Sequence, residues 1–138
     1  YGRVDGLLLL QPTSPFRSHT SMRAGLTLFS RNPGCSVVGV SPAATHPLWC
    51  FRLDGQKLKP FVESGGLHLR SQDLPPAYAV NGAFYLVPAG VLRTSHSLYA
   101  QDMLPLIMEN PAELVDIDTE QDWKLAEQLL AAQPRLSE

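Results

Sequence analysis

Cysteine is scarce in this chain, and the two cysteines present show no pattern that would bind a metal or build a disulfide framework. Cys35 and Cys50 form no CxxC motif and have no histidine at zinc-ligand spacing. His19, His46, His68 and His96 are scattered along the sequence. Isolated cysteines of this kind are typical of free thiols in a reducing compartment, so the sequence predicts a cytoplasmic protein.

Long apolar runs and an excess of positive charge are also missing. No run approaches the roughly 20 residues that a membrane-spanning helix needs, so we expect no membrane partner. The 11 Lys and Arg against 13 Asp and Glu leave a net charge of -2 and no basic face for a nucleic-acid backbone. With 138 residues, 44% of them hydrophobic, the sequence suits one domain over residues 1–138.

One apolar segment ends abruptly in a polar loop. Four leucines, Leu7 to Leu10, have the continuous apolar character of a strand covered on both faces, as in parallel sheets. The following loop offers the Gln11 amide and the hydroxyls of Thr13 and Ser14 between two prolines. Ligands of open α/β sheets bind beyond such strand ends, although an ordinary strand-to-helix loop would look the same.

The next segments predict a strand, a helix and a second strand in succession. Ser18 or Thr20 can cap a helix with Met22, Leu26 and Phe29 on one face, which Asn32-Pro33-Gly34 would end. Residues 36–40 read as a second buried strand. This order indicates a right-handed βαβ unit with parallel strands, and hence an α/β fold.

The middle of the chain predicts a hairpin followed by an irregular arm. Asp54-Gly55 is a favoured hairpin turn, with residues 57–62 as the returning strand. Residues 63–76 have little periodicity, and a long irregular segment of this kind is usually an interaction surface or a functional loop. Residues 83–87 then resume a core strand.

Two carboxylates near the end of the chain have two interpretations. Asp116 and Asp118 in an extended segment would point to the same side, which suits a magnesium ion that also contacts substrate phosphates. Alternatively, Asp118 or Thr119 caps the helix predicted over residues 120–130. The two roles can coexist.

Four separated segments resemble one family, the acylneuraminate cytidylyltransferases or CMP-sialic acid synthetases. Their order and spacing match that family across nearly the whole chain. The segments are Leu9-Leu10-Gln11-Pro12-Thr13-Ser14-Pro15-Phe16-Arg17, Gln72-Asp73-Leu74-Pro75, Asn81-Gly82-Ala83-Phe84-Tyr85, and Asp116-Ile117-Asp118-Thr119-Glu120-Gln121-Asp122-Trp123-Lys124-Leu125-Ala126-Glu127.

The resemblance implies a fold and a reaction. The fold is a Rossmann-like α/β domain with a mostly parallel sheet and a protruding dimerisation arm, here over residues 48–74, so we expect a homodimer. The reaction transfers CMP from CTP to a sialic-acid-like nonulosonic acid, giving the CMP-sugar and pyrophosphate. It requires Mg²⁺ (or Mn²⁺).

The resemblance also assigns roles to individual residues. Asp116 and Asp118 become the catalytic metal carboxylates, and Gln11 reaches the bound sugar or nucleotide. On the acceptor-sugar side it implies Gln72, Asn81, Tyr85 and Tyr99. The family's arginine before the glutamine is replaced by Ser71, so Arg70 would have to reach the sugar carboxylate from one position earlier.

One departure from the family limits the predicted activity. The glycine-rich loop with Arg and Lys that cradles the triphosphate has no counterpart in this sequence, so we expect this chain alone to be inactive. Two alternatives stay open: a catalytically silent dimeric interaction module of the same fold, and a CMP-Kdo-type or other sugar nucleotidyltransferase.

Overall fold

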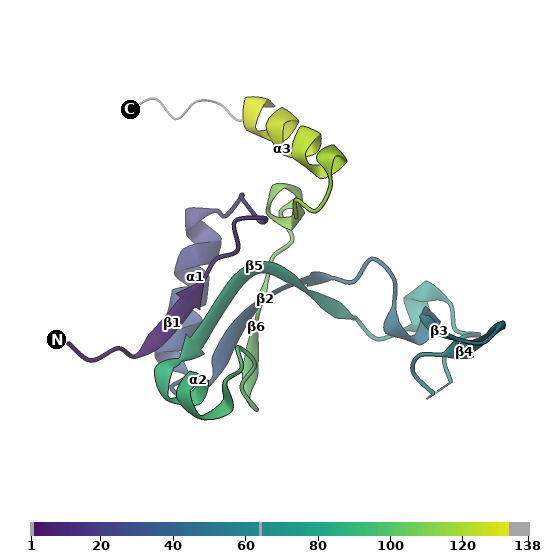
Figure 1. The fold of residues 1–138 in the computed structure, drawn as a ribbon, viewed down its shortest axis with the longest axis horizontal. Helices are drawn as coiled ribbons and strands as arrows, with labels where there is room; N and C mark the ends of the chain where they lie inside the picture. Colours follow the sequence, from purple (N-terminus) through teal and green to yellow (C-terminus); the bar gives the residue numbers. More distant parts are fainter. Residues whose placement is uncertain (1, 64, 133–138) are drawn as a thin grey trace. The chain divides into compact units, whose positions relative to one another are not determined.

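A mixed sheet organises the larger of two structural units in the computed structural model, which describes residues 2–63 and 65–132 (Figure 1). This first unit comprises the chain up to Ser41 and from Val80 onward, and the second unit is Pro42–Ala79. Within the described residues the sheet has four strands in the order β1-β5-β2-β6. They span Gly6–Leu9 (β1), Tyr78–Pro88 (β5), Ser36–Pro42 (β2) and Met103–Ile107 (β6).

The strand pairing corrects the expected mostly parallel sheet. β1 pairs antiparallel with β5, with Leu8 opposite Leu86, whereas β2 and β6 are parallel, with Val38 opposite Pro105. The sheet is mostly antiparallel, and a Rossmann-like fold is not confirmed. The reason is the insertion of β5 between β1 and β2, so that the two strands joined by the first helix are not neighbours.

Helix α1 (His19–Arg31) forms as the sequence predicts. The Ser18 hydroxyl accepts a hydrogen bond from the Ser21 N–H at 3.1 Å, which satisfies one of the free amides of the first turn. Met22 and Phe29 pack on the core, but Leu26 is exposed and Leu28 takes its place. Gly25 faces the ring of Phe84, where a Cβ atom would clash. The helix therefore lies close to the sheet.

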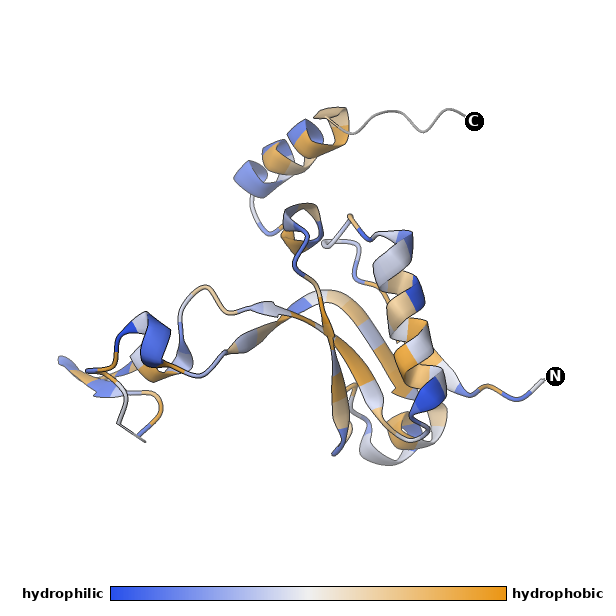
Figure 2. Cartoon of the chain, turned by 180° about the vertical axis from the view of Figure 1, so that it is seen from behind, coloured by the Kyte–Doolittle hydropathy of each residue, from blue (hydrophilic) through white to orange (hydrophobic). Residues whose placement is uncertain are grey.

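The core of the first unit is built mainly from the inner strands. Its buried residues are Val37, Ala83, Phe84, Leu86, Leu106 and Met108. Figure 2 shows hydrophobic colouring along the strands of this sheet, with hydrophobic and hydrophilic residues alternating on α1. Central position explains this burial, because β5 and β2 have a neighbouring strand on each side.

The leucines of β1 are less buried than their sequence predicts. Leu7 is 44% exposed and Leu8 37% exposed, so the expected cover on both faces is absent in the described structure. β1 is an edge strand of the described sheet, and its residues consequently have fewer neighbours than those of β5.

Three further helical segments complete the first unit. Helix α2 is Ala89–Ser95, a short 3-10 helix (η3) covers Pro111–Leu114, and α3 is Glu120–Ala132. The helix expected at residues 120–130 is thus confirmed. Among the described residues, none of the helices has the length and apolar character needed to cross a membrane.

The second unit contains the expected hairpin. Strand β3 (Phe51–Asp54) pairs antiparallel with β4 (Lys57–Pro60), and Asp54 lies opposite Lys57. Gly55 is the first of two turn residues and has a φ of +61°, a conformation that favours glycine. Two 3-10 helices, η1 (Pro47–Trp49) and η2 (Ser71–Asp73), flank the hairpin in sequence. This unit includes the arm expected at 48–74, and its part in dimerisation stays a prediction.

Candidate active site

The loop after β1 is held by hydrogen bonds to its own backbone and to β5. The Ser14 N–H donates to the Gln11 carbonyl at 3.2 Å, which closes a turn. Arg17 Nε donates to the Ala83 carbonyl at 2.7 Å, and Arg17 Nη2 donates to the Gln11 carbonyl. Burial lowers the pKa of Arg17, yet a guanidinium stays charged at neutral pH. The guanidinium therefore ties both ends of the loop to the sheet.

The segment with the two carboxylates lies against the same loop. The Ile117 N–H donates to the Thr13 carbonyl at 2.8 Å. The Ser14 hydroxyl lies 3.4 Å from Asp116 Oδ1, across 102 positions of sequence. The structure thus brings together two of the predicted site segments, those of Gln11 and Asp116.

A third predicted segment meets them at Asn81 and Gly82. Gly82 has a φ of +75°, and a Cβ atom there would lie 2.6 Å from Gln11 Oε1 and 3.3 Å from Ser14 Oγ. The Asn81 amide is already used within the unit: Nδ2 donates to Ser41 Oγ at 2.9 Å, and Oδ1 accepts from the Ala83 N–H at 3.1 Å. Asn81 therefore stabilises β5 at the point where the buried residues of this strand begin. We call Gln11, Ser14, Asn81, Gly82 and Asp116 the polar cluster.

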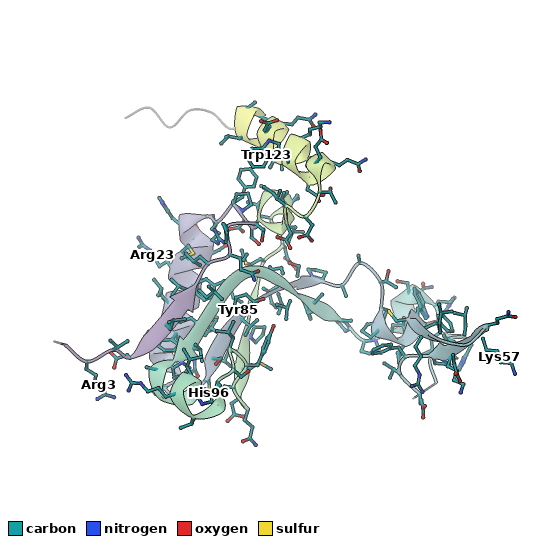
Figure 3. The ribbon with its side chains drawn as sticks, viewed as in Figure 1. Arg3, Arg23, Lys57, Tyr85, His96 and Trp123 are labelled. Atoms are coloured by element: carbon teal, nitrogen blue, oxygen red, sulfur yellow. The ribbon has the colours of Figure 1, made fainter. Side chains whose placement is uncertain are left out.

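Tyr85 and Tyr99 form a pair beside the polar cluster. Their rings meet edge to face with centroids 6.1 Å apart, and Tyr85, labelled in Figure 3, is only 6% exposed. Burial raises the pKa of Tyr85 to about 12, and the neighbouring Tyr99 and the charge of Asp116 add to that shift. Tyr85 is consequently a neutral phenol at physiological pH, suited to hydrogen bonding and not to accepting a proton as an anion.

The helix cap at α3 uses residues other than Asp116. The Asp122 N–H lies 3.3 Å from Thr119 Oγ1, while Asp122 Oδ2 accepts from the Thr119 N–H at 2.8 Å and from the Thr119 hydroxyl at 2.7 Å. These bonds from Thr119 hold the pKa of Asp122 below its usual range. Thr119 and Asp122 therefore form a reciprocal cap, and of the two capping alternatives the structure selects Thr119.

A magnesium site at Asp116 and Asp118 stays a prediction, and the accessibility of both carboxylates suits it. Both residues are exposed, and none of the ion pairs found within residues 2–63 and 65–132 involves them. The described residues contain no group of three or more His, Cys, Asp or Glu side chains able to hold a metal ion. Magnesium commonly takes one or two carboxylates and completes its shell with water and phosphate oxygens, so two carboxylates are enough for the predicted site.

Thr119 and Asp118 contribute differently to the helix cap, so their substitution should affect stability differently. Thr119→Ala should lower the free energy of unfolding by about 0.5–2 kcal/mol, the usual cost of a lost helix cap. Asp118→Ala should change it by less than about 0.5 kcal/mol, because only the backbone N–H of Asp118 joins the cap network, at 3.3 Å from Asp122 Oδ2. Denaturant unfolding of both variants measures the difference. A larger loss for Asp118→Ala would mean that Asp118 is the capping residue.

Two predicted residues belong to the second unit. Arg70 Nε pairs with Asp73 Oδ2 at 2.9 Å, and the side chain is exposed. Gln72 is also exposed and lines a hollow of about 330 Å³ with His46 and Trp49. Their contact with an acceptor sugar stays a prediction.

Glu113 is a buried carboxylate that the sequence analysis did not single out. It is 5% exposed and accepts hydrogen bonds from the Ser18 N–H at 2.6 Å and from the Ser21 hydroxyl at 3.0 Å. Its negative charge therefore sits at the N-terminus of α1, where the helix dipole stabilises it. No local pattern around Glu113 marks it, because its partners lie more than ninety positions earlier.

An apolar hollow beneath α3 is distinct from the polar cluster. It has a volume of about 720 Å³, and its lining includes Phe16, Glu113, Ile117 and Trp123. Trp123, on α3, is labelled in Figure 3. Gln11, Asn81 and Asp116 are not part of this lining. The polar cluster, which holds these predicted site residues, therefore stays the candidate active site.

Comparison with known proteins tests the family resemblance that these motifs suggest. A scan against models of protein families finds no match. The chain is nevertheless 37% identical over 134 residues to the CMP-N,N'-diacetyllegionaminic acid synthase of Legionella pneumophila subsp. pneumophila, strain Philadelphia 1. The alignment covers 91% of this chain and 54% of that synthase, so the chain spans about half the length of this relative.

This similarity and the motif-bearing cluster define the class of protein. The chain belongs to the acylneuraminate cytidylyltransferases, the CMP-sialic-acid-synthetase type of nucleotidyltransferase. The resemblance drawn from the four sequence segments is confirmed.

Proposed function

We propose that the complete protein containing this chain transfers CMP from CTP to a nonulosonic acid and releases pyrophosphate. The observation that carries the proposal is the 37% identity to a CMP-N,N'-diacetyllegionaminic acid synthase over 91% of the chain. The structure supports it by bringing Gln11, Asn81 and Asp116 from three separate segments into the polar cluster. Cys35 and Cys50 are free thiols, which suits a cytoplasmic biosynthetic enzyme.

The reaction is a nucleotidyl transfer. An anomeric hydroxyl of the acid sugar forms a bond to the α-phosphorus of CTP and loses its proton, while the bond to the bridging oxygen of pyrophosphate breaks. Reactions of this type depend on positioning and charge stabilisation more than on covalent intermediates. Asp116 and Asp118 would hold Mg²⁺ (or Mn²⁺), which when bound offsets negative charge on the phosphates.

Residues around the polar cluster would bind the acceptor. The Gln11 amide can both donate to and accept from sugar hydroxyls, and its place is set by the turn that Ser14 and Arg17 close. The neutral phenol of Tyr85 is a further donor. The roles of Arg70 at the sugar carboxylate and of Gln72 at the acceptor, both in the second unit, stay predictions.

An assay with a panel of acceptors tests this function. The complete protein is incubated with CTP, magnesium and, in parallel, N,N'-diacetyllegionaminic acid, N-acetylneuraminic acid, pseudaminic acid and Kdo, and CMP-sugar and pyrophosphate are measured. We expect CMP-sugar with at least one nine-carbon acid. Product with Kdo alone would favour the related eight-carbon activity, and no product with any acid would favour the silent interaction module. The 138-residue chain alone should give no turnover.

We also propose that the second unit forms a homodimer. Leu53 is 77% exposed and Leu58 is 64% exposed, and they lie opposite one another in the hairpin. Phe51 is on the same face, two residues from Leu53, and is also exposed. The alternate residues, Arg52, Asp54, Lys57 and Lys59, are polar. An apolar face on a two-stranded hairpin suits burial against the same face of a second copy.

A charge placed on this face should separate the copies. We expect Leu53→Glu to raise the dissociation constant of the dimer by about 30-fold or more, since it buries a charge in the contact. Gln56→Glu, in the exposed turn of the same hairpin, adds the same charge outside that face and should leave the dimer intact. Light scattering over a range of concentrations measures both. A wild-type monomer at micromolar concentration would contradict the proposal.

A further inference from the structure

The Ser14 side chain is buried where three segments of the first unit meet. It is 0% exposed, and its Oγ lies 3.4 Å from Asp116 Oδ1 and 3.5 Å from the Asn81 carbonyl oxygen. A hydroxyl has one hydrogen to donate, so it can serve one of these acceptors at a time. The ionised carboxylate is the stronger acceptor and should hold the bond most of the time.

The position of this hydroxyl is set by the backbone around it. The Ser14 N–H is bonded to Gln11, and the next backbone contact, from Ile117 to Thr13, joins the Asp116 segment directly to the loop. Gly82 leaves room on the remaining side, since a Cβ atom there would come within 3.3 Å of Ser14 Oγ. The hydroxyl is consequently a rigid donor facing an otherwise exposed carboxylate.

We infer that Ser14 is a positioning residue for Asp116, and that its hydroxyl orients the carboxylate which the proposed reaction uses to bind a divalent cation. This inference rests on the proposed function. Residues that hydrogen-bond a metal ligand typically change metal affinity by about 10- to 100-fold when they are removed. The bond to Asp116 is long at 3.4 Å, so the lower end, about 10-fold, is expected.

The test measures manganese binding and does not need turnover. The complete protein is titrated with manganese chloride, and free Mn²⁺ is followed by electron paramagnetic resonance. Ser14→Ala should raise the dissociation constant about 10-fold. Ser14→Cys keeps the side-chain shape with a somewhat larger atom and a weaker donor, so it should fall between wild type and Ser14→Ala, and it decides the question if Ser14→Ala does not fold.

Ser36→Ala is the matched control. Ser36 is also fully buried, but its Oγ has no hydrogen-bond partner among the described residues. Ser36 is the first residue of β2, whereas Ser41, whose hydroxyl accepts a hydrogen bond from Asn81, lies near the other end of that strand. The substitution removes the same oxygen from a buried site, so manganese affinity should stay at the wild-type value.

The outcomes separate this inference from the function on which it rests. Weaker manganese binding in the Ser14 variants, with wild-type binding in Ser36→Ala, supports the positioning role. Unchanged binding in the Ser14 variants together with lost binding in Asp116→Ala overturns that role and leaves the metal site standing. If Asp116→Ala binds manganese as tightly as wild type, the metal site itself is wrong and the role of Ser14 falls with it.

Discussion

Asp116→Ala should abolish magnesium-dependent CMP-sugar formation by the complete protein while leaving its melting temperature almost unchanged. A metal ligand that offsets phosphate charge contributes several kcal/mol to the transition state, so the loss of activity should be about 100-fold or more. The side chain is exposed, and the Ser14 hydroxyl that donates to it can donate to the Asn81 carbonyl oxygen instead, so the free energy of unfolding should change by less than about 0.5 kcal/mol.

An aspartate outside the polar cluster provides the comparison. Asp102 is exposed and directly precedes β6, where its backbone carbonyl accepts from the Ser36 N–H at 3.1 Å. Asp102→Ala removes one exposed carboxylate, as Asp116→Ala does, and should retain activity. Steady-state rates are measured for both variants against magnesium concentration, alongside thermal melts. An Asp116→Ala protein that stays active and responds to magnesium would rule out the metal role.

Local signals explain which parts of the fold the sequence predicted correctly. The cap at Ser18, the Gly55 turn and the start of α3 each depend on residues within a few positions of one another. Strand pairing depends instead on segments far apart, and four leucines in a row do not reveal that β5 will be their neighbour. The sheet was therefore predicted as mostly parallel although it is mostly antiparallel.

The same distinction applies to the candidate site. The family motifs identified Gln11, Asn81 and Asp116, and the structure places their segments together. Arg17 and Glu113 received no role from the sequence, and Ser14 was only one of the loop hydroxyls, because the contacts that join them to other segments span between 66 and 102 positions. The rings of Tyr85 and Tyr99 lie in contact, and their contact with a sugar remains a prediction, like those of Arg70 and Gln72.

Gly82→Ala should damage both stability and acceptor binding, because two separate constraints act on this glycine. A side chain at a φ of +75° is strained by about 1–2 kcal/mol. The new methyl group would also press on Gln11 Oε1 at 2.6 Å. We expect the free energy of unfolding to fall by about 1–3 kcal/mol. A displaced Gln11 should lower kcat/KM for the acid sugar by up to about 100-fold, as misplacement by about 1 Å can do.

Gly34→Ala separates the two constraints. Gly34 has a φ of +93°, but a Cβ atom there would meet nothing within 4 Å. It carries the backbone strain without the contact, so it should lower stability by about 1–2 kcal/mol and leave kcat/KM unchanged. Equal kinetic losses in both variants would show that strain alone, and not the contact with Gln11, is responsible.

A double variant tests the contact with Gln11 directly. Gln11→Ala removes the atoms that the Gly82→Ala methyl group would press against, so in that background the added stability cost should fall to the value measured for Gly34→Ala. The coupling between the two positions, measured by denaturant unfolding of both single variants and the double variant, is therefore expected to be about 0.5–1 kcal/mol. Additive costs would mean that the new methyl group clashes with an atom other than Gln11 Oε1, and Ser14 Oγ at 3.3 Å is the next nearest atom. Because Ser14 contacts Asp116, that result would predict weaker metal binding in Gly82→Ala in place of weaker sugar binding.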